Sequence, residues 1–367
     1  MKILFSDNTL WGLLNFRMGV IMHLMEQGNE IVLVAPEDDL CDISQIPSTV
    51  KYFPILLSRT GTNPLKDFKY YNQLKKIYKQ EKPDYIFHYT IKPNIYGTYA
   101  AKSLKIPSSM MIAGLGHIFN KNTLSSFVAQ TMYKFAICYS KKILVLNREN
   151  YEKLLKYNFV KKKKIVLLEG GEGVNVDQFV PSVKNDNKIV FIMICRILYE
   201  KGYKEYIGAA TALRSLAEFH LMGPIDSHPT AVKRETIDAD VAAGIIKYID
   251  YSPDVISQIA HSDCIVLPSY NEGLSRVLME GLAMGKPLIT TDIAGCRETV
   301  MEGVNGFICE PRSIESLTEA CRKFLNLSKM SRNQMGNQSR KLAMNTFDEK
   351  IVFSKYDAIL RGSIGKK

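Results

Sequence analysis

Short apolar runs alternate with amphipathic stretches along the chain. Near its start, Lys2–Ser6 and Glu30–Ala35 are apolar runs of strand length, and Leu13–Gln27 between them repeats its apolar residues every three or four positions. Runs of this kind are typical of buried strands, and the repeat is typical of a helix with one face in the core. Gly28 is suited to end that helix. The order strand, helix, strand predicts a parallel sheet covered by helices.

The same alternation predicts two α/β halves. In the first half we expect further strands at Lys51–Ile55, Pro83–Tyr89, Pro107–Ala113, Lys142–Leu146 and Ile165–Leu168. In the second half we expect strands at Lys188–Ile194, Phe219–Met222, Tyr248–Asp250, Cys264–Leu267 and Pro287–Thr291. The polar stretch Ser182–Asn187 is the expected linker. We therefore predict a first domain at residues 1–181, a second at 182–346, and a last helix within residues 347–367.

Composition is that of a globular protein, with 46% hydrophobic and 23% charged residues in 367. No apolar run approaches the roughly 18 residues that a membrane-spanning helix needs. The chain enters a strand pattern directly, without the features of a signal peptide. The seven cysteines form no C-x-x-C pair, which predicts reduced core residues rather than disulfides or metal ligands. We expect a cytoplasmic protein.

The net charge of +11 is concentrated in the first half. Residues 1–180 carry 24 Lys or Arg and 15 Asp or Glu, whereas the remainder carries 24 and 22. The predicted helix Leu65–Lys79 places five lysines among tyrosines and leucines. A helix of this type suits an anionic membrane surface, but core packing with a solvated lysine face is the competing interpretation and is slightly favoured. The charge would also suit nucleic acid, but no known binding module is present, so we expect no nucleic-acid partner.

One stretch of the second half carries the strongest functional signal. The apolar run Cys264–Leu267 is followed by a loop with Glu272 and Gly273, a helix at Leu274–Met284 and the strand Pro287–Thr291. The first amides of a helix are unpaired and lie at its positive dipole end, so they favour a phosphate. Glu272 and Glu280 are separated by seven residues, which places the second acid about two helical turns further along.

The string PSYNEGLSRVLMEGLAMGKPLITTD within this stretch resembles the donor-binding motif of glycosyltransferase family 4, whose members are retaining enzymes with the GT-B fold. The resemblance extends over the chain, strongly after Gly170 and weakly before it. It implies two Rossmann-like domains facing a central cleft, with the last helix packed back on the first domain. It also implies a nucleotide-sugar donor in the second domain and an acceptor in the first.

The resemblance assigns donor-side roles to particular residues. Glu272 would hold hydroxyl groups of the transferred sugar and Glu280 the ribose, while Gly273, Leu274 and Ser275 would contribute amides at the helix start. The family pattern of an arginine followed by Lys-Gly is present as Arg196 and Lys201, and these two cations would hold the diphosphate as it leaves. A histidine near the sugar is common in the family, and His117 lies within one or two residues of that place.

Acceptor-side candidates are fewer. Arg17, in a Phe-Arg pair that resembles relatives acting on lipid-linked sugars, would meet an acceptor phosphate or simply pair with an acid. His88, Lys92 and Asn94 follow the end of a predicted strand, where ligands bind in open α/β sheets. A structural role for His88 explains its position equally well.

Within the family, the chain looks most like bacterial enzymes that add N-acetylgalactosamine or galactose to undecaprenyl-pyrophosphate-linked sugars during O-antigen, capsule or glycan assembly. The expected activity is therefore transfer of a hexose or N-acetylhexosamine, with N-acetylgalactosamine the first choice, from a UDP-sugar at the inner face of the plasma membrane. No metal or other cofactor is expected, and the D-x-D at Asp238–Asp240 is discounted because no hydrophobic strand adjoins it. A UDP-N-acetylhexosamine 2-epimerase of the same fold and a non-catalytic nucleotide-sugar-binding protein are the alternatives.

Overall fold

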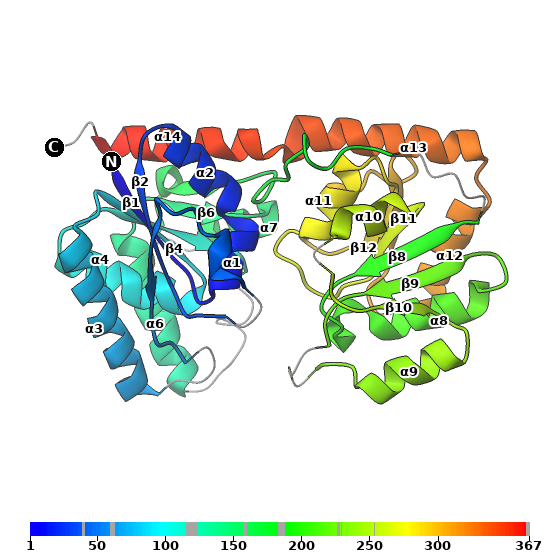
Figure 1. The fold of residues 1–367 in the computed structure, drawn as a ribbon, viewed down its shortest axis with the longest axis horizontal. Coiled ribbons are helices and arrows are strands. Elements are labelled where there is room, and N and C mark those ends of the chain that lie inside the picture. The colour runs from blue at the N-terminus through cyan, green and yellow to red at the C-terminus, as the bar shows by residue number, and fades with distance from the viewer. Residues whose placement is uncertain are drawn as a thin grey trace. The chain divides into compact units, whose positions relative to one another are not determined.

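The structure is a computed structural model that describes residues 1–38, 41–58, 63–114, 124–156, 160–182, 188–225, 228, 230–252 and 254–364. It separates into two compact units. Unit 1 comprises Met1–Glu172 together with Glu349–Lys367, and unit 2 comprises Gly173–Asp348 (Figure 1). The division falls before the expected linker, so the segment from Gly173 to Pro181 belongs to unit 2 and the last helix belongs to unit 1.

Unit 1 is built on a seven-stranded parallel sheet with the order β3-β2-β1-β4-β5-β6-β7. Its strands are β1 (Lys2–Ser6), β2 (Glu30–Ala35), β3 (Lys51–Pro54), β4 (Tyr85–Tyr89), β5 (Ser108–Ile112), β6 (Ile143–Val145) and β7 (Ile165–Leu167). Its α-helices are α1 (Leu10–Phe16), α2 (Met18–Glu26), α3 (Pro64–Glu81), α4 (Thr98–Ser103), α6 (Leu124–Tyr139), α7 (Arg148–Lys156) and α14 (Glu349–Ile364). Shorter helical turns are η1 (Ile43–Gln45), η2 (Pro93–Gly97) and η3 (Lys162–Lys164).

Unit 2 is built on a six-stranded parallel sheet with the order β10-β9-β8-β11-β12-β13. Its strands are β8 (Val190–Ile194), β9 (Glu218–Met222), β10 (Lys247–Ile249), β11 (Cys264–Leu267), β12 (Leu288–Thr291) and β13 (Gly306–Cys309). Its α-helices are α8 (Tyr203–Leu213), α9 (Arg234–Ala242), α10 (Val255–Ala260), α11 (Arg276–Ala283), α12 (Ile314–Leu325) and α13 (Lys329–Leu342). Shorter turns are η4 (Tyr199–Lys201), η5 (Arg297–Thr299) and η6 (Ala343–Phe347).

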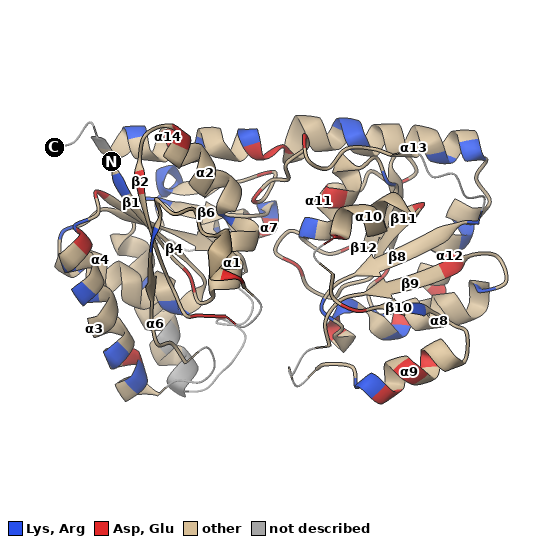
Figure 2. Ribbon diagram, in the orientation of Figure 1, with Lys and Arg blue, Asp and Glu red and all other residues tan. Residues whose placement is uncertain are grey.

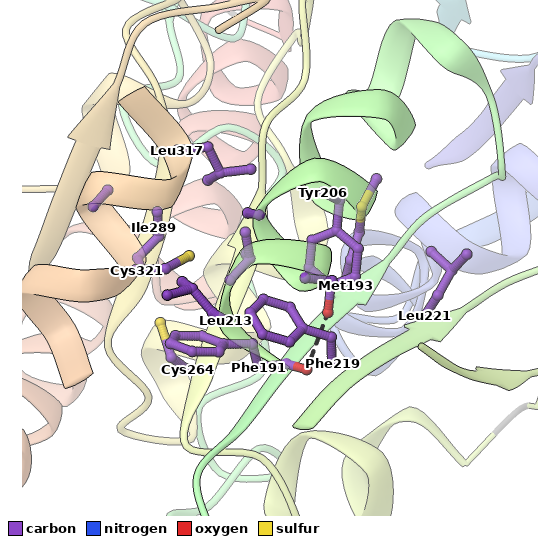
Figure 3. Packing of buried hydrophobic residues seen from close by; sticks show 14 of the residues in the cluster. Phe191, Met193, Tyr206, Leu213, Phe219, Leu221, Cys264, Ile289, Leu317 and Cys321 are labelled. Carbon is purple, nitrogen blue, oxygen red and sulfur yellow. Dashed lines mark hydrogen bonds between the residues drawn. The ribbon is translucent and has the colours of Figure 1, made fainter. Parts of the chain in front are cut away.

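The central strands are buried on both faces, and for this reason they are continuous apolar runs in the sequence. In unit 1, Phe5 of β1 lies level with Leu33 of β2 and Phe87 of β4, and all three are buried. In unit 2, Figure 3 shows Phe191 and Phe219 from neighbouring strands packed with residues of α8 and α12. Burial of each such side chain stabilises the fold by about 1.5–3 kcal/mol.

Both sheets contain a switch point, where consecutive connections leave in opposite directions. In unit 1 it lies between β1 and β4, and in unit 2 between β8 and β11. Open parallel sheets bind their ligands beyond the carboxyl ends of the strands at such points. A ligand of unit 2 is therefore expected at the loops that follow β8 and β11.

Three differences from the sequence-based expectations have physical explanations. The expected helix Leu13–Gln27 is two helices that meet at Arg17, and the first begins earlier because the Thr9 hydroxyl accepts a hydrogen bond from the Gly12 amide at 2.8 Å. Helix α9 was not expected because only Ile237 is buried, so the segment lacks an apolar repeat. Strand β13 was not expected because its run, Gly306–Cys309, is short and begins at a glycine, and there a Cβ would collide with the Leu288 carbonyl oxygen of β12.

Candidate active site

The loop after β11 is held against the segment after β8 by its backbone. The Tyr270 amide donates a hydrogen bond to the Glu200 carbonyl oxygen at 2.9 Å. Gly202 has a φ of +85° and lies against Pro268, where a Cβ would collide with the carbonyl oxygen. Only glycine adopts this backbone conformation readily and leaves room for the close approach. The two segments that carry the predicted donor residues are therefore fixed to each other at the switch point.

Lys201 and Glu272 form an ion pair at this junction. The Lys201 Nζ and Glu272 Oε1 atoms are 2.6 Å apart, and the side chains are only 17% and 13% exposed. Burial opposes the positive charge of Lys201, but the Glu272 carboxylate outweighs burial and raises the pKa of the amine. The sequence placed these residues 71 positions apart, and the structure brings them into contact.

Arg196 lies close to this pair. It lies two residues after the end of β8 and is exposed, and its positive charge acts to lower the pKa of Lys201. Two cations and one carboxylate thus gather beyond the carboxyl ends of β8 and β11. Such a group can neutralise a diphosphate and accept hydrogen bonds from hydroxyl groups.

Glu280 lies in α11 and is buried. It accepts a hydrogen bond from Arg276 Nε at 2.8 Å. Burial raises the pKa of the Glu280 carboxyl, and the neighbouring Arg276 partly offsets this effect. In this structure the carboxylate is paired within its own helix.

The predicted amides at the start of α11 are not equivalent. Gly273 and Leu274 are half-buried in the loop, whereas the Ser275 amide donates to the Gly295 carbonyl oxygen at 3.1 Å. In this structure the Ser275 amide therefore helps to fix the loop, and its contact with a phosphate stays a prediction. A Cβ on Gly295 would lie 2.6 Å from the Gly273 carbonyl oxygen, so this glycine allows the two turns to pack closely.

Arg17 of unit 1 occupies a buried ion-pair cluster. Its guanidinium contacts Glu172, lies 3.8 Å from an oxygen of Asp7 and sits 4.4 Å above the Tyr89 ring. Burial opposes its charge, and the two carboxylates outweigh burial and raise its pKa. The acid pairing that the sequence left open as an alternative is present. Sequence reasoning missed both partners: Asp7 precedes the helix that ends at Arg17, and Glu172 is 155 positions away in the chain.

His88 and Asn94 lie in the core of unit 1. The His88 ring nitrogens lie 3.1 Å from the Tyr78 hydroxyl and 3.4 Å from the Thr98 hydroxyl, and burial lowers its pKa to about 3. The Asn94 amide donates to the Met111 carbonyl oxygen at 2.7 Å. Both side chains are covered and bonded within the core, which is the structural role that the sequence left open for His88. Contact of His88 and Asn94 with an acceptor stays a prediction.

Lys92 is paired and His117 is not described. The Lys92 Nζ atom lies 2.7 Å from Asp67 Oδ1, and both side chains are largely buried. His117 lies outside the described residues. In the D-x-D segment, Asp238 pairs with Arg234 at 2.9 Å and Asp240 accepts a hydrogen bond from the Tyr203 hydroxyl at 2.6 Å. Among the described residues, no three His, Cys, Asp or Glu side chains are grouped as a metal site would require.

The fold and the site define a class of protein. Residues 176–342 match the family model for glycosyl transferases group 1, and residues 2–167 match the model for glycosyl transferase 4-like proteins. The chain belongs to these glycosyltransferases and has the GT-B fold of two Rossmann-like units. It is an enzyme, and the epimerase and non-catalytic alternatives are not supported.

The chain is similar in sequence to two curated relatives and in fold to one solved structure. It is 27% identical to N,N'-diacetylbacillosaminyl-diphospho-undecaprenol alpha-1,3-N-acetylgalactosaminyltransferase of Campylobacter jejuni, with 97% of each chain covered. It is 25% identical to UDP-Gal:alpha-D-GlcNAc-diphosphoundecaprenol alpha-1,3-galactosyltransferase of Escherichia coli, with 74% of this chain and 76% of that one covered. The crystal structure of Anabaena HepE in complex with UDP superimposes with a TM-score of 0.79 at 17% identity, covering 99% and 100% of the two chains.

Proposed function

We propose that this enzyme transfers a hexose or N-acetylhexosamine, N-acetylgalactosamine in the first instance, from a UDP-sugar to an undecaprenyl-diphosphate-linked saccharide. The relatives from Campylobacter jejuni and Escherichia coli are named for such acceptors and for N-acetylgalactosamine and galactose transfer. The observation that carries the proposal is the Lys201–Glu272 pair beyond the carboxyl ends of β8 and β11. The reaction would contribute to the assembly of a surface polysaccharide or glycan.

In the proposed mechanism, the donor replaces the internal ion pair. Lys201 and Arg196 neutralise the diphosphate as the bond to the sugar breaks, and Glu272 accepts hydrogen bonds from hydroxyl groups of that sugar. The leaving diphosphate takes the proton of the acceptor hydroxyl, so the new bond forms on the same face and the anomeric configuration is retained. Glu280 would hold the ribose, which requires it to exchange its bond to Arg276. No metal ion is required, because the two cations supply the compensating charge.

A transfer assay tests this proposal. The purified enzyme is incubated with radiolabelled UDP-N-acetylgalactosamine, UDP-galactose, UDP-glucose or UDP-N-acetylglucosamine and a short-chain undecaprenyl-diphosphate-linked saccharide. We expect one donor to label the lipid, an α-linkage by NMR, and undiminished turnover in EDTA. Glu272→Ala should lower turnover at least 100-fold. The proposal would be refuted if the wild-type enzyme, like Glu272→Ala, transferred no labelled sugar from any of the four donors.

Unit 1 would meet the lipid-linked acceptor at a membrane surface. Among the described residues, every helix is too short or too polar to cross a bilayer. However, six large apolar side chains are exposed on segments that follow the carboxyl ends of the parallel strands, namely Leu56, Leu65, Phe68, Ile91, Phe127 and Val128. Leu65 and Phe68 are 76% and 61% exposed, and they alternate along α3 with the exposed Lys66 and Lys69. Figure 2 shows basic positions interspersed with uncharged ones along α3. Such a surface suits an anionic bilayer.

Vesicle sedimentation tests the membrane contact. We expect the enzyme to sediment with phosphatidylglycerol vesicles and to remain in solution with phosphatidylcholine vesicles or at high salt. The pair Leu65→Ser and Phe68→Ser should abolish sedimentation, whereas Met330→Ser, an equally exposed methionine of α13 in unit 2, should not. Equal sedimentation of both variants would exclude α3 as the contact.

A further inference from the structure

Two residues outside the assigned site connect the same two segments as Lys201 and Glu272. The Tyr270 hydroxyl donates to the Glu205 carboxylate and lies 2.8 and 2.7 Å from its two oxygens. Glu205 lies in the first turn of α8, four residues after Lys201, and Tyr270 lies two residues before Glu272. The segment after β8 therefore contacts the loop after β11 through two side-chain pairs, one of which carries the proposed sugar contact.

The Glu205–Tyr270 pair places a carboxylate in a buried position, which apolar packing alone would not need. Glu205 is buried, and a buried carboxylate must be hydrogen-bonded to be tolerated. The Tyr270 ring is in turn covered by the Arg312 guanidinium, 4.8 Å from the ring centre. Arg312 itself has a φ of +63°, which is uncommon for a residue other than glycine. Polar groups of Glu205, Tyr270 and Arg312 thus hold one side of the loop, where apolar side chains could have packed.

Both polar groups of the peptide bond between Ser269 and Tyr270 are also hydrogen-bonded. The Tyr270 amide donates to the Glu200 carbonyl oxygen at 2.9 Å, and the Ser269 carbonyl oxygen accepts from the Thr291 hydroxyl at 2.5 Å. These bonds hold the backbone before Glu272, and the Ser275 amide bond to the Gly295 carbonyl oxygen holds it after Glu272. The Glu205–Tyr270 bond adds a side-chain contact between the loop and α8.

We propose that Glu205 and Tyr270 are positioning residues that hold the loop so that the Glu272 carboxylate meets the transferred sugar. The inference rests on the proposed role of Glu272. Misplacement of a group at the reacting centre by about 1 Å can cost 100-fold in rate. The pair affects the sugar end of the donor and not the uridine, so its loss lowers turnover and leaves the affinity for UDP itself unchanged.

Kinetics of four variants test the pair. Tyr270→Phe and Glu205→Ala should each lower kcat about tenfold or more, with the Kd for UDP, measured by calorimetry, within twofold of wild type. Glu205→Gln keeps an oxygen that can accept the phenol hydrogen, so it should retain most of the activity. The double variant Tyr270→Phe with Glu205→Ala should be no slower than either single variant, because both changes remove one bond.

Tyr203→Phe is the matched control. Tyr203 is a buried tyrosine of the same helix, α8, and its hydroxyl donates at 2.6 Å to Asp240 of α9 instead of joining α8 to the loop after β11. A purely structural role for tyrosine–carboxylate bonds predicts equal losses for Tyr203→Phe and Tyr270→Phe, and that result would overturn the inference. Wild-type kcat in Tyr270→Phe, or a weaker Kd for UDP in parallel with the fall in kcat, would overturn it as well.

Glu272→Ala separates the two possible failures. If Glu272→Ala abolishes transfer and Tyr270→Phe does not, the positioning role is wrong and the proposed function stands. If Glu272→Ala transfers sugar at the wild-type rate, the assignment of Glu272 fails and the positioning role fails with it.

Discussion

Lys201 and Glu272 are the residues on which the account of the donor site rests. Both are mostly buried, and each neutralises the other across 2.6 Å. In the proposed mechanism, a diphosphate that binds Lys201 displaces the Glu272 carboxylate, which also repels it. The internal pair neutralises both charges, and we expect it to lower the affinity for the nucleotide alone.

Glu272→Gln is consequently expected to bind UDP more tightly while transferring sugar more slowly. The substitution leaves Lys201 without its counter-charge and removes the repulsion of the diphosphate, so we expect the Kd for UDP to fall about threefold or more. Calorimetry with UDP measures the first effect and the transfer assay the second. Glu319→Gln is the control, since Glu319 forms an exposed pair with Arg322 in α12. Weaker UDP binding by Glu272→Gln would contradict this electrostatic account.

His88 gives unit 1 a definite response to acid. Burial lowers its pKa to about 3 in the folded state, whereas the unfolded chain takes up the proton near pH 6.5. Between these values only the unfolded state carries the proton, so this group makes the free energy of unfolding fall as the pH falls from about 6.5 towards 3, by about 1.4 kcal/mol per pH unit.

Urea unfolding at pH 7 and pH 5 measures this response, followed by the fluorescence of Trp11, the single tryptophan, which lies in unit 1. His88→Gln should show a shallower dependence on pH than wild type, whatever its absolute stability. Equal slopes for the two proteins would show that His88 does not remain neutral in the folded state.

At the scale of elements, the junction between η4 and the loop after β11 determines the site. Gly202 ends η4 in the left-handed conformation and lies against Pro268, which brings Lys201 to Glu272. The sequence predicted the strands, the loop and the helix, because burial on both faces leaves continuous apolar runs. It could not predict the Ser275–Gly295 bond or the Glu205–Tyr270 bond, because these depend on which loops meet at the switch point.

Gly202→Ala should open this junction. The new Cβ would both strain the backbone and collide with Pro268, so we expect a loss of about 1–3 kcal/mol in unfolding free energy and a marked loss of transfer. Gly244→Ala is the matched control, because Gly244 also has a positive φ, +64°, but open space around it. It should cost only the backbone strain, about 1 kcal/mol, and leave transfer unchanged. Circular dichroism in urea measures the stability of each variant, and the transfer assay measures its activity. Equal losses of activity in Gly202→Ala and Gly244→Ala would show that the contact between Gly202 and Pro268 does not determine the site.

At the scale of the whole molecule, the alternation of strands and helices predicted two α/β units, and the glycosyltransferase resemblance predicted their type. The boundaries of the units were harder to predict from the sequence, because they depend on contacts between residues that are distant in the chain. The buried Val174 and Phe347 both belong to unit 2, where the Val174 amide donates to the Phe347 carbonyl oxygen at 2.8 Å. In unit 1, Tyr356 of α14 reaches Tyr89 of β4 with the hydroxyl oxygens 2.9 Å apart.

Two fragments test these limits. Residues 173–348 should fold and bind UDP with nearly the affinity of the full chain, because the residues assigned to the diphosphate and the ribose, Arg196, Lys201 and Glu280, lie within unit 2. Residues 182–346 lack Val174, Val176, Phe179 and Phe347, each a member of the same buried cluster and worth about 1.5–3 kcal/mol. We expect this shorter fragment to be unfolded by circular dichroism. Equal stability of the two fragments would place the boundary at the linker after all.

A crystal structure of the enzyme with an intact UDP-sugar tests the central claim most directly. The account predicts that the diphosphate lies beyond β8 and β11 within hydrogen-bonding distance, about 3 Å, of Lys201 Nζ, and that the Glu272 carboxylate has turned from Lys201 to the sugar hydroxyls. A nucleotide bound elsewhere, with the Lys201–Glu272 pair still closed, would contradict it.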